Sequence, residues 1–207
     1  MAKASPVPLE RVKQLRDMTG AGMMDCRTAL EDAEGDLDRA VRLLRERGVA
    51  RAAKRVGRQT GNGVVEAYLH RTSEDYPPQV GALVELNCES DFVAKGEDFR
   101  RLAHDLALHI AAANPRWVSV EDVPPEVVEQ ERELYRRQAE QEGRPPAVID
   151  RIVENKVARF YEEHCLQEQP FVRDPTVRVK DLIAQTAAKV QEHVAVRRFS
   201  RFSIKEA

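Results

Sequence analysis

VGALVELNC, residues 80–88, alternates between two kinds of side chain over its whole length. Successive side chains of a β-strand point to opposite sides, so one face of such a strand carries only apolar groups. These groups are Val80, Ala82, Val84 and Leu86. A shorter alternation at 64–70 precedes this stretch, and the loop between them contains Tyr76-Pro77-Pro78. We therefore predict two strands that form a hairpin at the centre of the fold.

Helical patterns follow the predicted hairpin. Apolar side chains recur at the spacing of one helix face in four further segments. These segments are 97–113, 125–142, 146–163 and 179–193. The last stretch, 194–204, alternates again, and a slip in its pattern near Phe199 predicts a β-bulge. A hairpin with a distant terminal strand indicates an α+β core, in which helices flank a small antiparallel sheet.

The first part of the chain has a different organisation. Residues 8–48 contain three short segments with helical spacing, separated by a turn at 19–22 and by Gly35. We expect Gly48 to end the third helix. About forty residues bury only a very small core, and such modules usually bind other proteins. We therefore divide the chain into a partner-binding module at 1–50, a basic linker or short helix at 51–61 and a core domain at 62–207.

Composition and charge argue against several classes of function. The chain has 207 residues, with 33 basic against 35 acidic side chains and a net charge of −2. This balance argues against direct capture of nucleic acid, which needs a basic surface. No run approaches the ~20 apolar residues that cross a bilayer, so we expect no membrane contact. The three cysteines, Cys26, Cys88 and Cys165, are far apart and odd in number, which is typical of the reducing cytoplasm.

No motif for bond-making chemistry is present in the sequence. The chain has neither the glycine-rich loop that cradles phosphates nor the elbow that presents a nucleophilic serine. Its cysteines are never paired at the spacing of a zinc site. His104 and His109 are five residues apart, whereas two metal ligands on one helix face are four apart, so each is better interpreted as structural. We therefore predict no catalytic residue, no metal and no cofactor.

Three places carry side chains that a purely structural role does not explain. At ~100° per residue, Met23 lies about 60° and Met24 about 160° from Cys26 around their helix, so Met24 points away from the module core. An exposed methionine beside a glycine turn suits a protein contact. Tyr68 and His70 share the mixed face of the first strand. That face is either packed by a helix or offered to a partner, and the spacing does not decide between them.

The connection after the second strand is a third such place. Ser90 or Asp91 is expected to cap a single helical turn before Gly96. Phe92 is then held at a tight corner beside an acidic residue. It serves either as a wedge against a partner or as a cover for the end of the core. The spacing alone leaves both interpretations open.

Longer motifs at these positions resemble those of the elongation factor Ts family. The motifs are TGAGMMDC at 19–26, NCESDFVAK at 87–95, QPFV at 169–172 and VRRF at 196–199. Together they span nearly the whole chain and occur in the order of the family. The family often has threonine where this chain has Ser90, so the hydroxyl group needed for capping is kept. The resemblance implies that the N-terminal module is of the ubiquitin-associated type.

The resemblance also implies a partner and a mechanism. The partner is elongation factor Tu, the GTPase that delivers aminoacyl-tRNA to the ribosome. It would be bound in its GDP form and, after GDP release, in its nucleotide-free form, which GTP then enters. The residues implied to disturb its magnesium and phosphate site are Ser90, Asp91, Phe92 and Val93. The residues implied to bind it elsewhere are Arg16, Met23, Met24, Tyr68 and His70.

The chain is most similar to the short form of this family. Longer members carry a second half of the core and a protruding coiled coil, and neither is visible in this sequence. In the short form two copies jointly supply what one long chain does, so we expect a homodimer in the cytoplasm. The competing hypothesis is a ubiquitin-associated-type adaptor with an unrelated α+β domain and no exchange activity.

Overall fold

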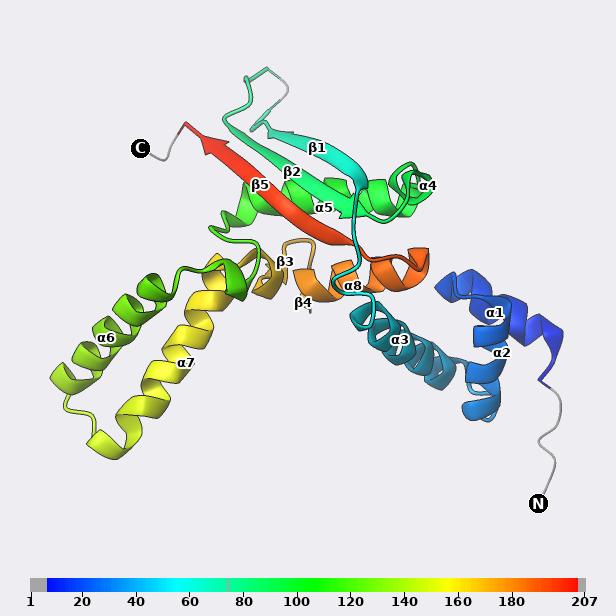
Figure 1. The fold of residues 1–207 in the computed structure, drawn as a ribbon, viewed down its shortest axis with the longest axis horizontal. Coiled ribbons are helices and arrows are strands. Elements are labelled where there is room, and N and C mark those ends of the chain that lie inside the picture. Colours follow the sequence, from blue (N-terminus) through cyan, green and yellow to red (C-terminus); the bar gives the residue numbers. More distant parts are fainter. Residues whose placement is uncertain (1–6, 74, 205–207) are drawn as a thin grey trace.

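A three-helix unit opens the fold in the computed structural model, which describes residues 7–73 and 75–204 (Figure 1). Its helices are α1 (Leu9–Thr19), α2 (Met23–Asp32) and α3 (Leu37–Ala53). They pack around a small core of their own, whose fully buried side chains include Leu15, Cys26 and Leu30. The three helices predicted from periodicity are therefore confirmed.

The third helix is longer than predicted, because Gly48 lies inside it. Glycine in a helix interior costs about 1 kcal/mol relative to alanine, and the packing explains its presence here. A Cβ atom at position 48 would lie only 2.9 Å from Cβ of Ala188 on α8 (Val179–Val190). Gly48 therefore allows α3 to approach α8 closely. The expected helix end at Gly48 is wrong, and the last turn of α3 occupies the start of the predicted linker.

A three-stranded antiparallel sheet forms the centre of the core, with the order β1-β2-β5. Its strands are β1 (Asn62–His70), β2 (Val80–Cys88) and β5 (Ala195–Ser203). The register between β2 and β5 shifts after Glu85, which leaves Arg197 as an extra residue of β5. The predicted hairpin, terminal strand and bulge are confirmed, and the bulge lies just before Phe199.

Among the residues that the structure describes, helices cover one face of this sheet and leave the other open. α5 (Glu97–Ala113) packs on β1 and β2, and α8 packs beside α5. The fully buried side chains between them include Val84, Leu86, Phe99, Leu106 and Ile110. The other face is open, and large apolar side chains are exposed on it. They are Val65 (67% exposed), Leu69 (62%), Leu83 (45%) and Phe202 (71%). The predicted α+β core is confirmed, with one buried and one open sheet face.

Two long helices project from the core as a pair (Figure 1). They are α6 (Pro125–Gln141) and α7 (Pro146–His164). A small apolar cluster between them consists of Ala139, Ile149, Val153 and Val157. An ion pair of 2.8 Å between Arg136 and Asp150 also links them. The expectation that no helical pair protrudes is wrong, because periodicity identified both helices but not which helix each one packs against.

The remaining elements are short. They are α4 (Asp91–Ala94), the strands β3 (Pro170–Phe171) and β4 (Asp174–Arg178), and the 3₁₀ turns η1 (Val120–Asp122) and η2 (Leu166–Glu168). β3 and β4 pair with each other. Across 7–73 and 75–204, no helix combines the length and the apolar character needed to cross a membrane.

One buried polar contact ties α5 to the segment after α7. Nε2–H of His109 donates to Oε1 of Gln169 at 2.9 Å, and the backbone N–H of Val172 donates to Nδ1 of His109 at 3.3 Å. Gln169 in turn donates to the carbonyl oxygen of Glu163 at 2.7 Å. The hydrogen bond that Nδ1 accepts from Val172 requires a neutral ring, and burial lowers the pKa of His109. The structural role predicted for His109 is thus confirmed.

The lowered pKa of His109 predicts how stability depends on pH. In the unfolded chain the pKa of His109 is about 6.5. On acidification, His109 therefore takes up a proton more readily in the unfolded state than in the native state. The free energy of unfolding therefore falls as the pH decreases through about 6.5. We expect His109→Gln to weaken this dependence in urea unfolding, and His104→Gln, on the same helix, to keep it. An unchanged dependence in His109→Gln contradicts the prediction.

Candidate partner-binding site

A tight turn after β2 holds Phe92 at the surface. Oγ of Ser90 accepts a hydrogen bond from the backbone N–H of Val93 at 3.3 Å and so caps α4. Val93 is buried in the core, with 7% of its surface exposed, whereas Phe92 is 83% exposed. The predicted cap at Ser90 is confirmed. The interpretation in which Phe92 covers the end of the core is ruled out.

A distant segment anchors this turn. The carboxylate of Glu192 accepts hydrogen bonds from the backbone N–H groups of Glu89 and Ser90, both at 3.0 Å. Glu192 follows α8 and lies 102 residues after Ser90 in the sequence. Sequence reasoning missed this contact, because no local pattern links two segments so far apart.

Asp91 adds a negative charge beside the exposed ring. Its side chain is 71% exposed and accepts a hydrogen bond from Nζ of Lys95 at 2.7 Å. This hydrogen bond and the charge of Lys95 lower the pKa of Asp91, so its carboxylate is ionised at neutral pH. An exposed ion pair is weak. A partner with a stronger positive charge therefore competes with Lys95 for Asp91.

Tyr68 and His70 lie on the sheet face that α5 covers. Tyr68 is half-buried against the core, and its ring meets the edge of the His104 ring at 5.9 Å between centroids. Its hydroxyl lies 3.4 Å from Nδ1 of His70. Because Asn62 pairs with the last residue of β2, Tyr68 lies six residues further along β1, or roughly 20 Å from the turn. The structure therefore separates this pair from Phe92.

The predicted contacts of the module lie on α1 and α2. Arg16 is exposed on α1, and Met24 is 71% exposed on α2. Met23 is half-buried and packs against the module core. The outward direction predicted for Met24 is confirmed, whereas its contact with a partner stays a prediction. The module and α4 lie at the same end of the longest axis, opposite to the tip of the α6–α7 pair (Figure 1).

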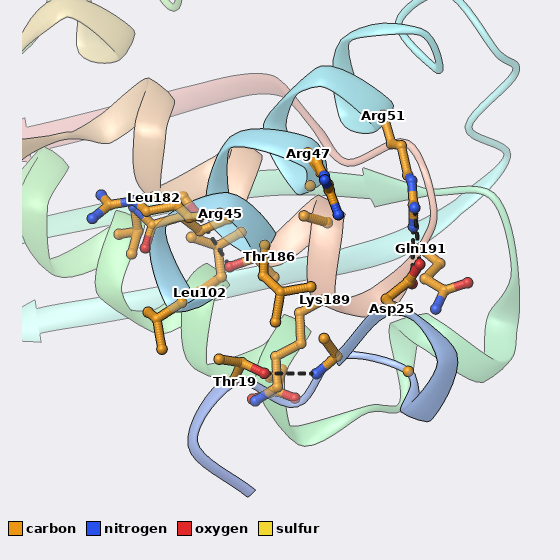
Figure 2. A pocket seen from close by; sticks show the side chains of 18 of the residues that line it. Thr19, Asp25, Arg45, Arg47, Arg51, Leu102, Leu182, Thr186, Lys189 and Gln191 are labelled. Carbon is orange, nitrogen blue, oxygen red and sulfur yellow. Dashed lines mark hydrogen bonds and ion pairs between the residues drawn. The ribbon is translucent and has the colours of Figure 1, made fainter. Parts of the chain in front are cut away.

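A cleft of about 530 Å³ separates the module from α5 and α8 (Figure 2). Charged side chains line it, and ion pairs form along each of its walls. Arg51 donates two hydrogen bonds to Asp25, at 2.8 and 2.9 Å, which tie the end of α3 to the start of α2. Lys189 pairs with Asp98 at 2.6 Å. The predicted site residues lie outside this cleft, so it is the junction of two units and not part of the predicted contact surface.

Comparison with known proteins decides the family. The family described as "Elongation factor TS" matches residues 10–206 of the chain. Elongation factor Ts of Thermosipho melanesiensis is 49% identical over 195 residues, which cover 94% of this chain and 97% of that protein. Elongation factor Ts of Caldanaerobacter subterraneus subsp. tengcongensis is 50% identical over 196 residues, or 95% and 96% of the two chains.

The chain belongs to the elongation factor Ts family. Elongation factor Ts is the nucleotide exchange factor for elongation factor Tu, so this chain is a translation elongation factor and not an enzyme. The family match spans both the module and the core, which sets aside an adaptor with an unrelated second domain. Its 207 residues agree with the short bacterial form of elongation factor Ts.

Replacing Phe92 separates a contact role from a structural one. Because the ring is 83% exposed, Phe92→Ala should leave the thermal midpoint nearly unchanged. We expect it to slow GDP release from elongation factor Tu tenfold or more, which is about 1.4 kcal/mol. Fluorescent GDP reports this rate in a stopped-flow measurement.

The neighbouring residue supplies the matched control. Val93→Ala removes buried methyl groups, so it should lower the free energy of unfolding by roughly 1–2 kcal/mol. Exchange per folded molecule should change less than in Phe92→Ala. A Phe92→Ala protein that melts early but exchanges normally would place the ring in a structural role.

Proposed function

We propose that the Ser90–Val93 turn loosens the magnesium and phosphate site of GDP-bound elongation factor Tu. The observation that carries this proposal is the exposure of Phe92, 83%, on a turn whose other side is fastened to the core by Val93. A ring on a fixed backbone keeps its direction when it is pressed against a partner. Asp91, ionised and adjacent, competes for groups around the magnesium ion or repels the phosphates.

The exchange itself needs no chemical step in this chain. A GTPase holds its nucleotide through a phosphate loop and a magnesium ion. An exchange protein that binds the GTPase better when those contacts are broken lowers the affinity of the GTPase for the nucleotide. The nucleotide lowers the affinity of the GTPase for the exchange protein by the same ratio. GTP then enters the nucleotide-free complex. Speeding release about ten-thousandfold requires a fall of roughly 5.5 kcal/mol in the barrier.

Several contacts must therefore act together, because one buried wedge contributes only about 2–4 kcal/mol. We assign a second contact to Arg16, Met23 and Met24 of the module, which would grip the nucleotide-binding domain. Tyr68 and His70 would add a third contact at the other end of β1. We also propose that 1–50 is a separate partner-binding module, 51–61 its connection and 62–207 the core that contacts the GTPase and dimerises. The site of action is the cytoplasm, with the other translation factors.

The division of labour between module and turn is testable at Met24. The side chain is 71% exposed, so Met24→Ala should leave the module folded. We expect it to raise the Kd for elongation factor Tu about tenfold, roughly 1.4 kcal/mol. The GDP release rate at saturating factor should not change, because the module contributes affinity and not the push on the magnesium site.

Met18 provides the control, since it is 57% exposed in the same module but is not assigned to the contact. Met18→Ala should bind like the unmodified protein. If the Met24→Ala and unmodified proteins bind elongation factor Tu with equal affinity, the contact assigned to the module is wrong.

The homodimer is proposed to form through the open face of the sheet. A sheet buries its apolar face against another layer, and across the described residues no helix covers this one. Leu69 and Phe202 flank Gly81 in one row across the strands. The same face on a second copy offers a complementary apolar surface in an isologous pairing. The association is noncovalent, since Cys165 is buried and burial raises its pKa to about 11.

A solution mass tests this arrangement. The chain of 23.5 kDa should sediment at twice that mass at concentrations that support exchange. Phe202→Glu should shift the equilibrium to the monomer, because it puts a charge into the apolar surface of the pairing. Leu9→Glu is the control, since Leu9 is 61% exposed on α1, away from the sheet. A monomeric mass for the unmodified protein would end the proposal.

A further inference from the structure

Two glutamates form a reciprocal clasp between the end of β2 and the start of β5. Oε2 of Glu192 accepts hydrogen bonds from the backbone N–H groups of Glu89 and Ser90, both at 3.0 Å. In the opposite direction, Oε1 of Glu89 accepts from the backbone N–H of His193 at 2.6 Å. Each carboxylate therefore satisfies backbone donors of the other segment.

Glu192 also controls the cap of α4. The hydroxyl of Ser90 donates to Oε1 of Glu192 at 2.5 Å and accepts from the backbone N–H of Val93 at 3.3 Å. Because its proton is committed to Glu192, the Ser90 oxygen presents a lone pair to Val93. Hydrogen bonds to an ionised acceptor are stronger than those between neutral groups. The order of the cap thus depends on a hydrogen bond to a side chain from a different part of the chain.

The turn needs such external support. α4 contains four residues, Asp91–Ala94, and a helix of this length is not stable by itself. Its own anchors are the buried Val93 and the cap at Ser90. Neither of these fixes the backbone at Glu89, which precedes the cap. The clasp fixes that backbone.

The fold maintains strain to bring Glu192 to this position. Gln191 ends α8 with φ of 60°, in the left-handed region that residues other than glycine rarely adopt. Such a conformation is unfavourable for a residue with a side chain and persists when surrounding contacts hold it. This single residue redirects the chain from α8 so that Glu192 reaches the turn.

A third segment meets the same clasp. Nδ2 of Asn62 donates to the carbonyl oxygen of Glu89 at 2.8 Å, and Arg58 donates to Oε2 of Glu89 at 3.4 Å. The bond from His193 and the charge of Arg58 lower the pKa of Glu89, which keeps its carboxylate ionised. The segment between α3 and β1 is therefore fastened to the turn as well.

We propose that Glu192 is a positioning residue for nucleotide exchange: it holds the Ser90–Val93 turn in the one conformation from which Phe92 acts on the GTPase. The inference rests on the proposed role of Phe92. Glu192 itself needs no contact with the partner. Its loss leaves Val93 in the core and the module untouched, so the protein folds and binds but transmits less of its binding energy to the nucleotide site.

The test compares four proteins in a double-mutant cycle. Glu192→Ala should lower the GDP release rate at saturating factor at least about fivefold, while the affinity for elongation factor Tu changes less. In the Phe92→Ala background the same change should have almost no further effect, because the turn then has no ring to position. Amide hydrogen exchange at Glu89 and Ser90 should become faster in Glu192→Ala.

Two further variants separate positioning from stability. Glu192→Gln keeps an oxygen for both backbone N–H groups and an amide that donates to Ser90, so its release rate should return to within about twofold of the unmodified protein. Glu162→Ala removes a half-exposed glutamate of α7 that pairs with Arg178 at the end of β4, and this variant should promote exchange normally. A loss in Glu192→Ala that the Gln variant does not restore would overturn a positioning role through these hydrogen bonds.

The cycle distinguishes failure of the inference from failure of the proposed function. If Phe92→Ala leaves the release rate unchanged, the role assigned to the turn is wrong and Glu192 has nothing to position. If Phe92→Ala slows release but Glu192→Ala does not, the inference alone is wrong. It is equally wrong if Glu192→Ala slows release by the same factor in both backgrounds.

Discussion

The antiparallel pairing of β2 with β5 determines where the other parts of the site lie. It sets Asn87 opposite Ala195, so the segment that enters β5 arrives beside the turn that leaves β2. Only this register lets the carboxylates of Glu89 and Glu192 reach the backbone N–H groups of the opposite segment. A shift of one residue would turn the side chains of β5 to the other face of the sheet and move Glu192 by about 3.3 Å.

Buried side chains lie next to the exposed residues of the proposed contacts. Val93 enters the core while Phe92 stands in solvent, and Cys26 is buried in the module while Met24 is exposed. In both pairs the buried side chain fixes the backbone that carries the exposed one. Such anchoring matters for an exchange factor. If the backbone beside a contact moves when the partner binds, the binding energy is lost in that movement and does not distort the nucleotide site of the partner.

Close packing joins helix α3 to the core. Gly48 lets α3 lie against Ala188 of α8, and the neighbouring Lys189 pairs with Asp98 of α5, which ties α8 to the rest of the core. α8 therefore carries the module on one side and leads into Glu192 on the other. A single helix thus connects the proposed grip of the module with the proposed action of the turn, which suits a process that needs several contacts at once.

The sequence by itself determined the elements of this protein and, through its motifs, the family. The alternation at 80–88 and the helical pattern at 97–113 predicted β2 and α5 to the residue, because both patterns reflect local backbone geometry. Only the tertiary structure decided that Gly48 lies inside α3, that Phe92 is exposed and that Glu192 fastens its turn. The physical reason is that periodicity reports which side of an element is apolar, whereas contacts between segments about a hundred residues apart depend on strand register and on helix packing, which no local window of sequence contains.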